Sequence, residues 1–199
     1  QNLLDDPLRL LRALRLAAEL SMTIDEATFE MLARHRHHLP KVAAERIQAE
    51  VLKLVRAHSA DQAIRLLHSL QLIAPWSSDQ PQRTLHAEAL TKQEQQVALP
   101  LARLTQLLSD QGASDLRFSR KQIQRCVQLR KWWMRDQQQS ADTLNEKERL
   151  KLHQELKEDL PAFTLTWPVE RQEEWLSRWR DQEDKLFHPS PPLNGRTLQ

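Results

Sequence analysis

Apolar residues recur at intervals of three and four along most of this chain, which is the spacing of one face of an α-helix. The first such stretch predicts a helix over residues 6–20. The alternation that marks a strand is absent, and the chain has only two glycines and no tyrosine. Leu, Ala, Gln, Arg and Glu, which dominate, lose little freedom on entering a helix. The sequence therefore predicts an all-α fold, a multi-helix array without a β-sheet.

Turn signals divide the chain into further predicted helices. Thr23 and Glu26 have the spacing of a capping box, so we expect a second helix from there to about Arg36. Later helices are expected over the ranges 43–58, 61–70, 84–109, 120–135, 144–158 and 168–186. The clearest linker contains Pro75 and Pro81. We therefore predict successive domains over residues 1–75, 76–142 and 143–199.

Composition limits the cellular setting. The lone Cys126 cannot form an internal disulfide, and the sequence shows no secretory leader, so we expect a reducing cytoplasm. No apolar run approaches the ~18 residues of a membrane span, so we expect no membrane partner. Basic residues exceed acidic ones up to residue 135, whereas acidic ones exceed basic ones over residues 136–186. This asymmetry favours a local surface for a polyanion.

The first helix begins with Asp5, Asp6 and Pro7 and carries three arginines at intervals of three. Asp6 is expected to cap the helix with its carboxylate, and Pro7 suits the first helical position. Arg9, Arg12 and Arg15 are predicted to lie opposite the apolar face. An Asp and an Arg one turn apart also place an acceptor beside a donor fork, which is what reading the edge of a nucleobase requires.

A family resemblance rests on two segments, DDPLRLLRALRLAAELSMTIDEAT and VAAERIQAEVLKLV. They resemble the neck of class II tRNA nucleotidyltransferases and of the related bacterial poly(A) polymerases. In that family a Glu/Asp-Asp-x-x-Arg motif serves as an amino-acid template that pairs with the incoming base. Asp6 and Arg9 match it, Asp5 stands where Glu is usual, and Arg12 and Arg15 match basic positions that follow. The resemblance implies that Asp6, Arg9, Arg12 and Arg15 bind the nucleotide.

Weaker resemblances follow in the same order along the chain. Glu45-Arg46-Ile47 matches a motif that supports the template helix, LRFSRKQIQRC resembles a body-domain helix start, and PPLNGRTL resembles the opening of the tail signature. The three predicted domains then correspond to a neck, a body, and a body end with a truncated tail. The family's catalytic head, whose carboxylates bind Mg²⁺, has no counterpart here. We therefore expect no catalytic residue and no metal site in this chain, and no catalysis by it alone.

The resemblance implies the nucleotide-selecting and RNA-binding part of an enzyme that adds C and/or A to the tRNA 3′ end from CTP and ATP. Two alternatives stay open. One is a poly(A) polymerase of the same family, and the other is a non-catalytic helical RNA-binding or scaffold protein.

A basic helix in the second half is a predicted RNA-binding surface. Ser119 and Gln122 form a capping box at its start, and five basic residues are predicted to share one face before Asp136, with Trp132 among them. An ordinary solvated face is the competing interpretation. The predicted RNA contacts are Arg120, Lys121, Arg125, Lys131, Trp132 and Arg135. Trp175, Trp179 and Cys126 are expected to belong to the core.

The cluster Arg34-His35-Arg36-His37-His38 suggests two interpretations. Imidazoles ligate metals, but no Cys, Asp or Glu stands at ligand spacing. A basic helix C-terminus that complements the helix dipole is the favoured interpretation. Because the cluster is near the predicted nucleotide helix in sequence, we expect it to contact phosphate.

Overall fold

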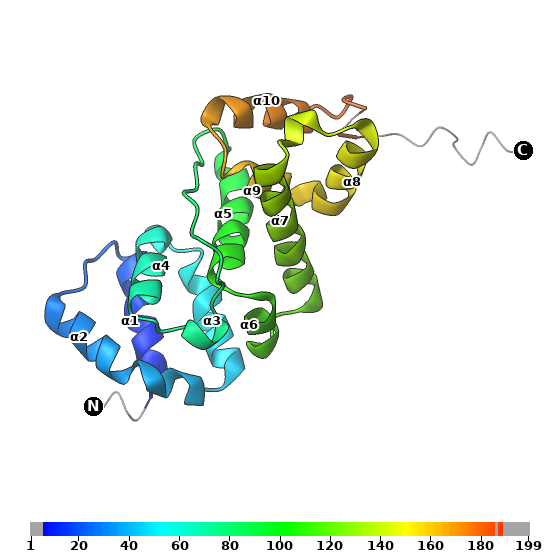
Figure 1. Ribbon diagram of the computed structural model, residues 1–199. Coiled ribbons are helices and arrows are strands. Elements are labelled where there is room, and N and C mark those ends of the chain that lie inside the picture. Colours follow the sequence, from blue (N-terminus) through cyan, green and yellow to red (C-terminus); the bar gives the residue numbers. More distant parts are fainter. Residues whose placement is uncertain (1–5, 186, 189–199) are drawn as a thin grey trace, which may run out of the picture.

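The computed structural model describes residues 6–185, 187 and 188, and they form the helical arrangement shown in Figure 1. The predicted all-α fold is confirmed, because these residues contain no strand and only an isolated bridge between Ser77 and Leu108. Asp5 and the PPLNGRTL segment lie outside the described residues. Whether the predicted boundaries separate true domains stays a prediction.

The N-terminal half builds one group of helices around α1 (Figure 1). Leu10, Leu11 and Leu14 on α1 are fully buried, and α1 packs mainly against α3 and α4. The apolar face predicted from the sequence is therefore the core face. The elements of this half are α1 (Leu8–Glu19), α2 (Glu26–His35), η1 (Arg36–Lys41), α3 (Ala44–Leu54), α4 (Ala60–Ser69) and η2 (Ala74–Trp76).

Two predicted helix starts are wrong. The cap of α2 is Asp25, whose carboxylate accepts a hydrogen bond from the Thr28 backbone N–H at 2.9 Å, so Thr23 is not the cap. Residues 84–91 are not helical, because the capping box that opens the next helix is formed by Thr91 and Glu94. Several residue types can cap a helix, so neighbouring candidates compete and the sequence alone does not select between them.

The C-terminal half is organised around α5, which packs against both α7 and α9 (Figure 1). The two halves are joined where η2 lies against α6. There Gly112 is required by space, because a Cβ atom built on it would lie 2.1 Å from the backbone oxygen of Trp76. The elements are α5 (Lys92–Leu107), α6 (Asp110–Asp115), α7 (Arg120–Gln138), η3 (Ala141–Thr143), α8 (Glu146–Leu156), η4 (Lys157–Asp159), α9 (Leu160–Thr164) and α10 (Val169–Arg180).

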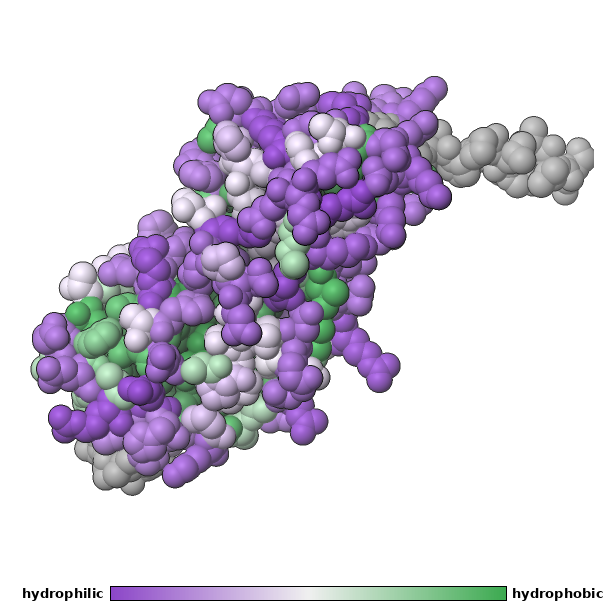
Figure 2. Space-filling view, viewed as in Figure 1, coloured by the Kyte–Doolittle hydropathy of each residue, from purple (hydrophilic) through white to green (hydrophobic). Residues whose placement is uncertain are grey.

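The surface differs between the two halves. Figure 2 shows apolar surface over the N-terminal helices and a mostly hydrophilic surface over the C-terminal ones. Exposed apolar side chains of the N-terminal half include Leu16, Leu20, Met22 and Met31. Within the described residues, every helix is too short or too polar to cross a membrane.

A half-buried polar cluster around Asp136 ties α10 to α7. The Asp136 carboxylate accepts from the indole N–H of Trp167 at 2.7 Å and from Arg171 Nη2 at 2.8 Å. It also accepts from the Ala141 backbone N–H at 2.8 Å, and the Arg171 guanidinium lies over the Trp167 ring at 3.7 Å. One carboxylate therefore satisfies donors from three segments.

Replacing Asp136 by Asn is expected to lower the free energy of unfolding by about 2 kcal/mol, since charge-assisted hydrogen bonds become neutral ones and Arg171 loses a charged partner. Urea unfolding monitored by circular dichroism measures this loss. Asp79→Asn, at an exposed position, serves as the matched control and should change stability little. Equal midpoints for the two variants would contradict the assigned role.

His153 on α8 is a buried imidazole without a hydrogen bond at Nε2. Its ring lies 4.0 Å from the ring of Phe187, centroid to centroid. Desolvation is the main cause that lowers the pKa of His153 to about 4, and the nearby charge of Asp184 opposes it. The folded protein therefore holds this histidine neutral.

Acid should weaken the fold through His153. The unfolded protein binds a proton at this residue near pH 6.5, whereas the folded protein resists protonation down to about pH 4. Between these values the unfolded state carries more protons, so the free energy of unfolding falls as the pH falls, by about 2 kcal/mol between pH 7 and pH 4.5. Urea unfolding of the wild type and of His153→Phe at both pH values tests this. The variant should lose less stability, and an equal loss would exclude His153 as the cause.

Candidate nucleotide and RNA site

Asp6 lies directly before α1, and its side chain is held by α3. The carboxylate accepts from Arg46 Nη2, with distances of 3.2 and 3.3 Å to its two oxygens. The prediction that this carboxylate caps α1 is wrong: Pro7 is the N-cap residue, with φ −63° and ψ −17°, and no side-chain cap bond forms. The cation of Arg46 provides the stronger partner, because its hydrogen bonds are charge-assisted on both sides.

Arg9 follows Asp6 at the distance of one helical turn. The Asp6 carbonyl accepts a hydrogen bond from the Arg9 backbone N–H at 3.1 Å, which fixes the two residues in successive turns. Arg9 is half-buried, and Arg12 in the next turn is exposed. The structure thus places Asp6 and Arg9, which the sequence predicts for base reading, one helical turn apart, and it adds Arg46, which the sequence predicted only as structural support.

Arg15 differs from the other arginines of α1. It is buried, with 9% of its surface exposed, although the sequence places it opposite the apolar face. Its Nε donates to Glu50 Oε2 at 2.6 Å, and Nη1 contacts Glu19. The hydrogen bond to Glu19 is the largest cause that raises the pKa of Arg15. Arg15 therefore fixes α1 to α3, and the prediction that it lies opposite the packed face is wrong at this position.

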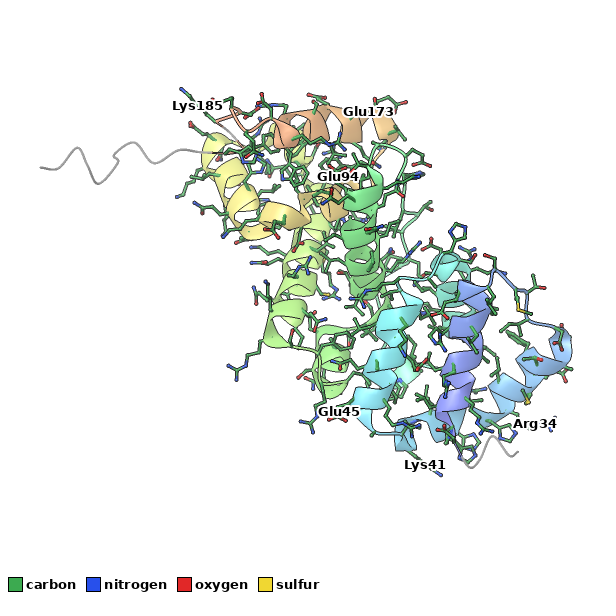
Figure 3. All side chains as sticks on the ribbon, turned by 180° about the vertical axis from the view of Figure 1, so that it is seen from behind. Arg34, Lys41, Glu45, Glu94, Glu173 and Lys185 are labelled. Carbon is green, nitrogen blue, oxygen red and sulfur yellow. The ribbon has the colours of Figure 1, made fainter. Side chains whose placement is uncertain are left out.

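Basic residues gather at the end of the molecule where α1 begins. Figure 3 shows Arg34, Lys41 and Glu45 at this end, and η1 packs against both α1 and α2. The pKa of His38 is lowered by desolvation and then by the positive charges of its neighbours His37, Lys41 and His35. Within the described residues, no group of three or more His, Cys, Asp or Glu could hold a metal ion. This end therefore carries the cations Arg34 and Lys41 beside the acidic Glu45, and the phosphate contact of the histidine cluster stays a prediction.

Much of the predicted RNA-binding face of α7 is paired within the protein. Arg125 donates to Asp159 through Nε at 2.8 Å and Nη2 at 2.5 Å, and the hydrogen bond to this carboxylate raises the pKa of Arg125. Lys131 Nζ donates to Glu155 at 2.7 Å, and Arg135 contacts Glu148. These three cations neutralise acids of α8 and η4.

Trp132 is a clear correction. The Trp132 side chain is 1% exposed, whereas the sequence predicted an exposed ring among the basic side chains of this helix. Its indole N–H donates to Glu155 Oε2 at 2.8 Å, and the Lys131 ammonium lies 5.4 Å from the ring centroid. Trp132 is therefore part of the core and cannot stack on a base. Trp175 and Cys126 are buried as predicted, and Trp179 is half-buried.

Arg120 and Lys121 stay exposed at the start of α7, close to α3. Gln48 of α3 donates from Nε2 to the carbonyl of Arg117 at 2.8 Å, which joins the two elements. Two cavities of about 200 and 530 Å³ lie beside α5 and α7, and Arg125 lines both of them. Their other polar lining residues are Arg56, Gln96, Gln122, Lys121, Gln124, Gln128, Gln154, Glu155, Lys157, Glu158 and Asp159.

This groove along α5 and α7 is the candidate RNA interface. Arg125 is already paired with Asp159. The cations of the lining that are left for phosphate oxygens are therefore Arg56, Lys121 and Lys157. The side-chain amides suit the hydroxyl groups of ribose. The sequence analysis missed Arg56 and Gln96. The only available signal was the run of glutamines on the polar faces of α5 and α7, which is typical of any solvated helix.

Comparisons with known proteins find relatives of part of this chain. Residues 21–80 match the family model described as "Probable RNA and SrmB- binding site of polymerase A". The chain is 40% identical over 86 residues to the CC-adding tRNA nucleotidyltransferase of Synechocystis sp., which is 43% of this chain and 21% of that protein. It is 38% identical over 68 residues to the CCA-adding enzyme of Oceanobacillus iheyensis. These residues make up 34% of this chain and 17% of that enzyme.

The CCA-adding enzyme of Levilactobacillus brevis is 38% identical over 60 residues, which is 30% of this chain and 15% of the relative. The matched segment thus spans about a fifth or less of the relatives' own length. Over residues 21–80 the chain is therefore similar to the RNA-binding region of polymerase A. Part of the chain is also similar to tRNA nucleotidyltransferases. The family model begins after α1, so the roles of Asp6 and Arg9 stay predictions.

Proposed function

We propose that this chain selects the nucleotide and binds the RNA for an enzyme that adds C and/or A to the tRNA 3′ end from CTP and ATP. The observation that carries the proposal is the start of α1. There Arg46 holds the Asp6 carboxylate one turn before Arg9, in a chain whose next segment matches the RNA-binding region of this family.

The paired side chains favour two of the four bases. The Asp6 carboxylate accepts a hydrogen bond from an exocyclic amino group, which cytosine and adenine both carry. The Arg9 guanidinium donates to the ring nitrogen or carbonyl beside that group. Uracil and guanine present a carbonyl where Asp6 needs a donor, so two acceptors would face each other. The proposed template therefore accepts CTP and ATP and rejects UTP and GTP.

The surroundings of α1 support a fixed template. Arg15 and Glu50 join α1 to α3 through a buried ion pair, and Arg46 fixes the carboxylate from the same helix. Recognition by preorganised groups loses little free energy to ordering when the ligand binds. We propose that Arg12 and the basic end at η1 contact the triphosphate, and that Arg120 and Lys121 with the neighbouring groove contact the RNA backbone.

We assign the chemical step to a nucleotidyltransferase head outside this chain. That head would hold Mg²⁺, which supports in-line nucleotidyl transfer to a 3′-hydroxyl. The residues of this chain bind and orient the base and the RNA. We also propose a cytoplasmic location, which is supported by the reduced, buried Cys126 and by the tRNA substrate of the relatives.

The poly(A) polymerase alternative is favoured by the name of the matched family model. Primer extension by the protein of the complete reading frame separates the alternatives. Under our proposal it extends a tRNA transcript that lacks its CCA end and then stops. Repeated addition of A to an unstructured RNA would support the poly(A) polymerase. A complete protein that binds both RNAs and extends neither would support the scaffold and contradict the proposal.

A further inference from the structure

A cavity of about 350 Å³ lies between α4, the segment 82–85 and α5, apart from the template and the α7 groove. It shares no lining residue with the groove described above. Three arginines line it, Arg65 from α4, Arg83 from the connecting segment and Arg103 from α5. The volume is sufficient for a small ligand or one end of a larger one.

Two of these arginines have no acidic partner. Arg103 is paired with Asp61, through Nε at 2.8 Å and Nη2 at 2.6 Å, so these two charges cancel. Arg65 and Arg83 make no side-chain hydrogen bond or ion pair with any described residue. The cavity therefore carries two uncompensated positive charges.

Arg83 is the more informative of the two, because it is half-buried. Its guanidinium lies 5.7 Å from the ring centroid of the buried Trp133, which provides an apolar base beneath it. Its backbone N–H contacts the side-chain oxygen of Gln106, which also lines the cavity. Asp136, the carboxylate whose charge reaches Arg83, is already bonded to Arg171 and Trp167. Partial burial of an unpaired cation costs free energy, which an anion in the cavity would offset.

We propose that this cavity binds a phosphate group in its dianionic, terminal form. A terminal phosphate carries about −1.5 to −2 charges at neutral pH, which matches two unpaired guanidinium groups, whereas a phosphodiester or a carboxylate carries one. A planar guanidinium group can donate two parallel hydrogen bonds to two oxygens of one phosphate. Free inorganic phosphate and the 5′-phosphate of an RNA share this chemistry. The inference does not depend on the proposed template, because no residue is shared between the two sites.

The test compares the 199-residue chain with Arg83→Gln and Arg65→Gln. Lys147→Gln, which removes an exposed cation elsewhere, is the matched control. Inorganic phosphate is titrated at constant ionic strength, and binding is read as the rise in the thermal unfolding midpoint. Each cavity variant should bind phosphate at least about tenfold more weakly than the wild type and the control. Arg83→Gln should fold without phosphate, because it removes an unpaired charge, and circular dichroism confirms this.

A second arm identifies the source of the phosphate. A short single-stranded RNA is offered with a 5′-phosphate or a 5′-hydroxyl at fixed salt. Tighter binding of the phosphorylated RNA that disappears in Arg83→Gln supports a 5′-phosphate, and dependence on Arg83 for inorganic phosphate alone supports the free anion. Equal phosphate binding by the wild type and both cavity variants would overturn the inference. Tighter binding of an oligoglutamate peptide than of inorganic phosphate would also overturn the inference.

Discussion

Replacing Glu50 by Ala is expected to lower the free energy of unfolding by about 3–5 kcal/mol, the usual loss when one partner of a buried ion pair is removed. Glu50 is 7% exposed and accepts from Arg15 Nε at 2.6 Å, so the substitution leaves a buried guanidinium with only Glu19 as its acidic neighbour. Because Arg15 belongs to α1, the variant should also loosen the helix that follows Asp6 and Pro7. Urea unfolding of the purified chain measures the loss.

A double variant separates the cost of an unpaired charge from the cost of lost packing. Arg15→Met combined with Glu50→Leu removes both charges and keeps most of the volume, so it should lose much less stability than Glu50→Ala. Lys53, whose ammonium lies 3.6 Å from Glu50 and is exposed, provides the control Lys53→Gln, which should change stability little. If the double variant were the less stable one, the buried pair would be a net source of stability and our account of it would be wrong.

The helices were predictable from the sequence because they depend on local spacing. The apolar face of α1, the capping box of Ser119 and Gln122, and the burial of Trp175 all follow from periodicity or capping chemistry. The cap of α2 and the start of α5 were mispredicted, since neighbouring residues offer similar capping groups.

The pairing of charges could not be predicted, because it joins residues far apart in the sequence. The basic face of α7 looked free, yet Arg125 pairs with Asp159 and Lys131 with Glu155. The acidic excess over residues 136–186 was interpreted as leaving the basic half free for a polyanion, whereas an acidic segment after a basic helix can also fold back onto it. The same limitation hid Arg46 as the partner of Asp6, and the cavity that unites Arg65 with Arg83.

Substitutions at the start of α1 are expected to change which nucleotide is added. Asp6→Asn keeps an oxygen that can accept from Arg46 and replaces the other by an amide N–H₂ group, which can donate to the carbonyl of uracil. Base discrimination by a good paired contact is worth about 1–3 kcal/mol, so the preference for CTP over UTP should fall by about ten- to a hundredfold. Arg9→Gln should weaken the same preference, since it removes the donor fork.

The most direct test is therefore the ratio of kcat/KM for CTP to that for UTP, measured with the protein of the complete reading frame on a tRNA that lacks its CCA end. Asp79→Asn and Lys147→Gln, both at exposed positions, serve as the matched controls. We predict that the ratio falls at least about tenfold in Asp6→Asn and in Arg9→Gln and stays at the wild-type value in both controls. A wild-type ratio in Asp6→Asn and Arg9→Gln, in proteins that still extend the tRNA, would contradict the assignment of base reading to α1.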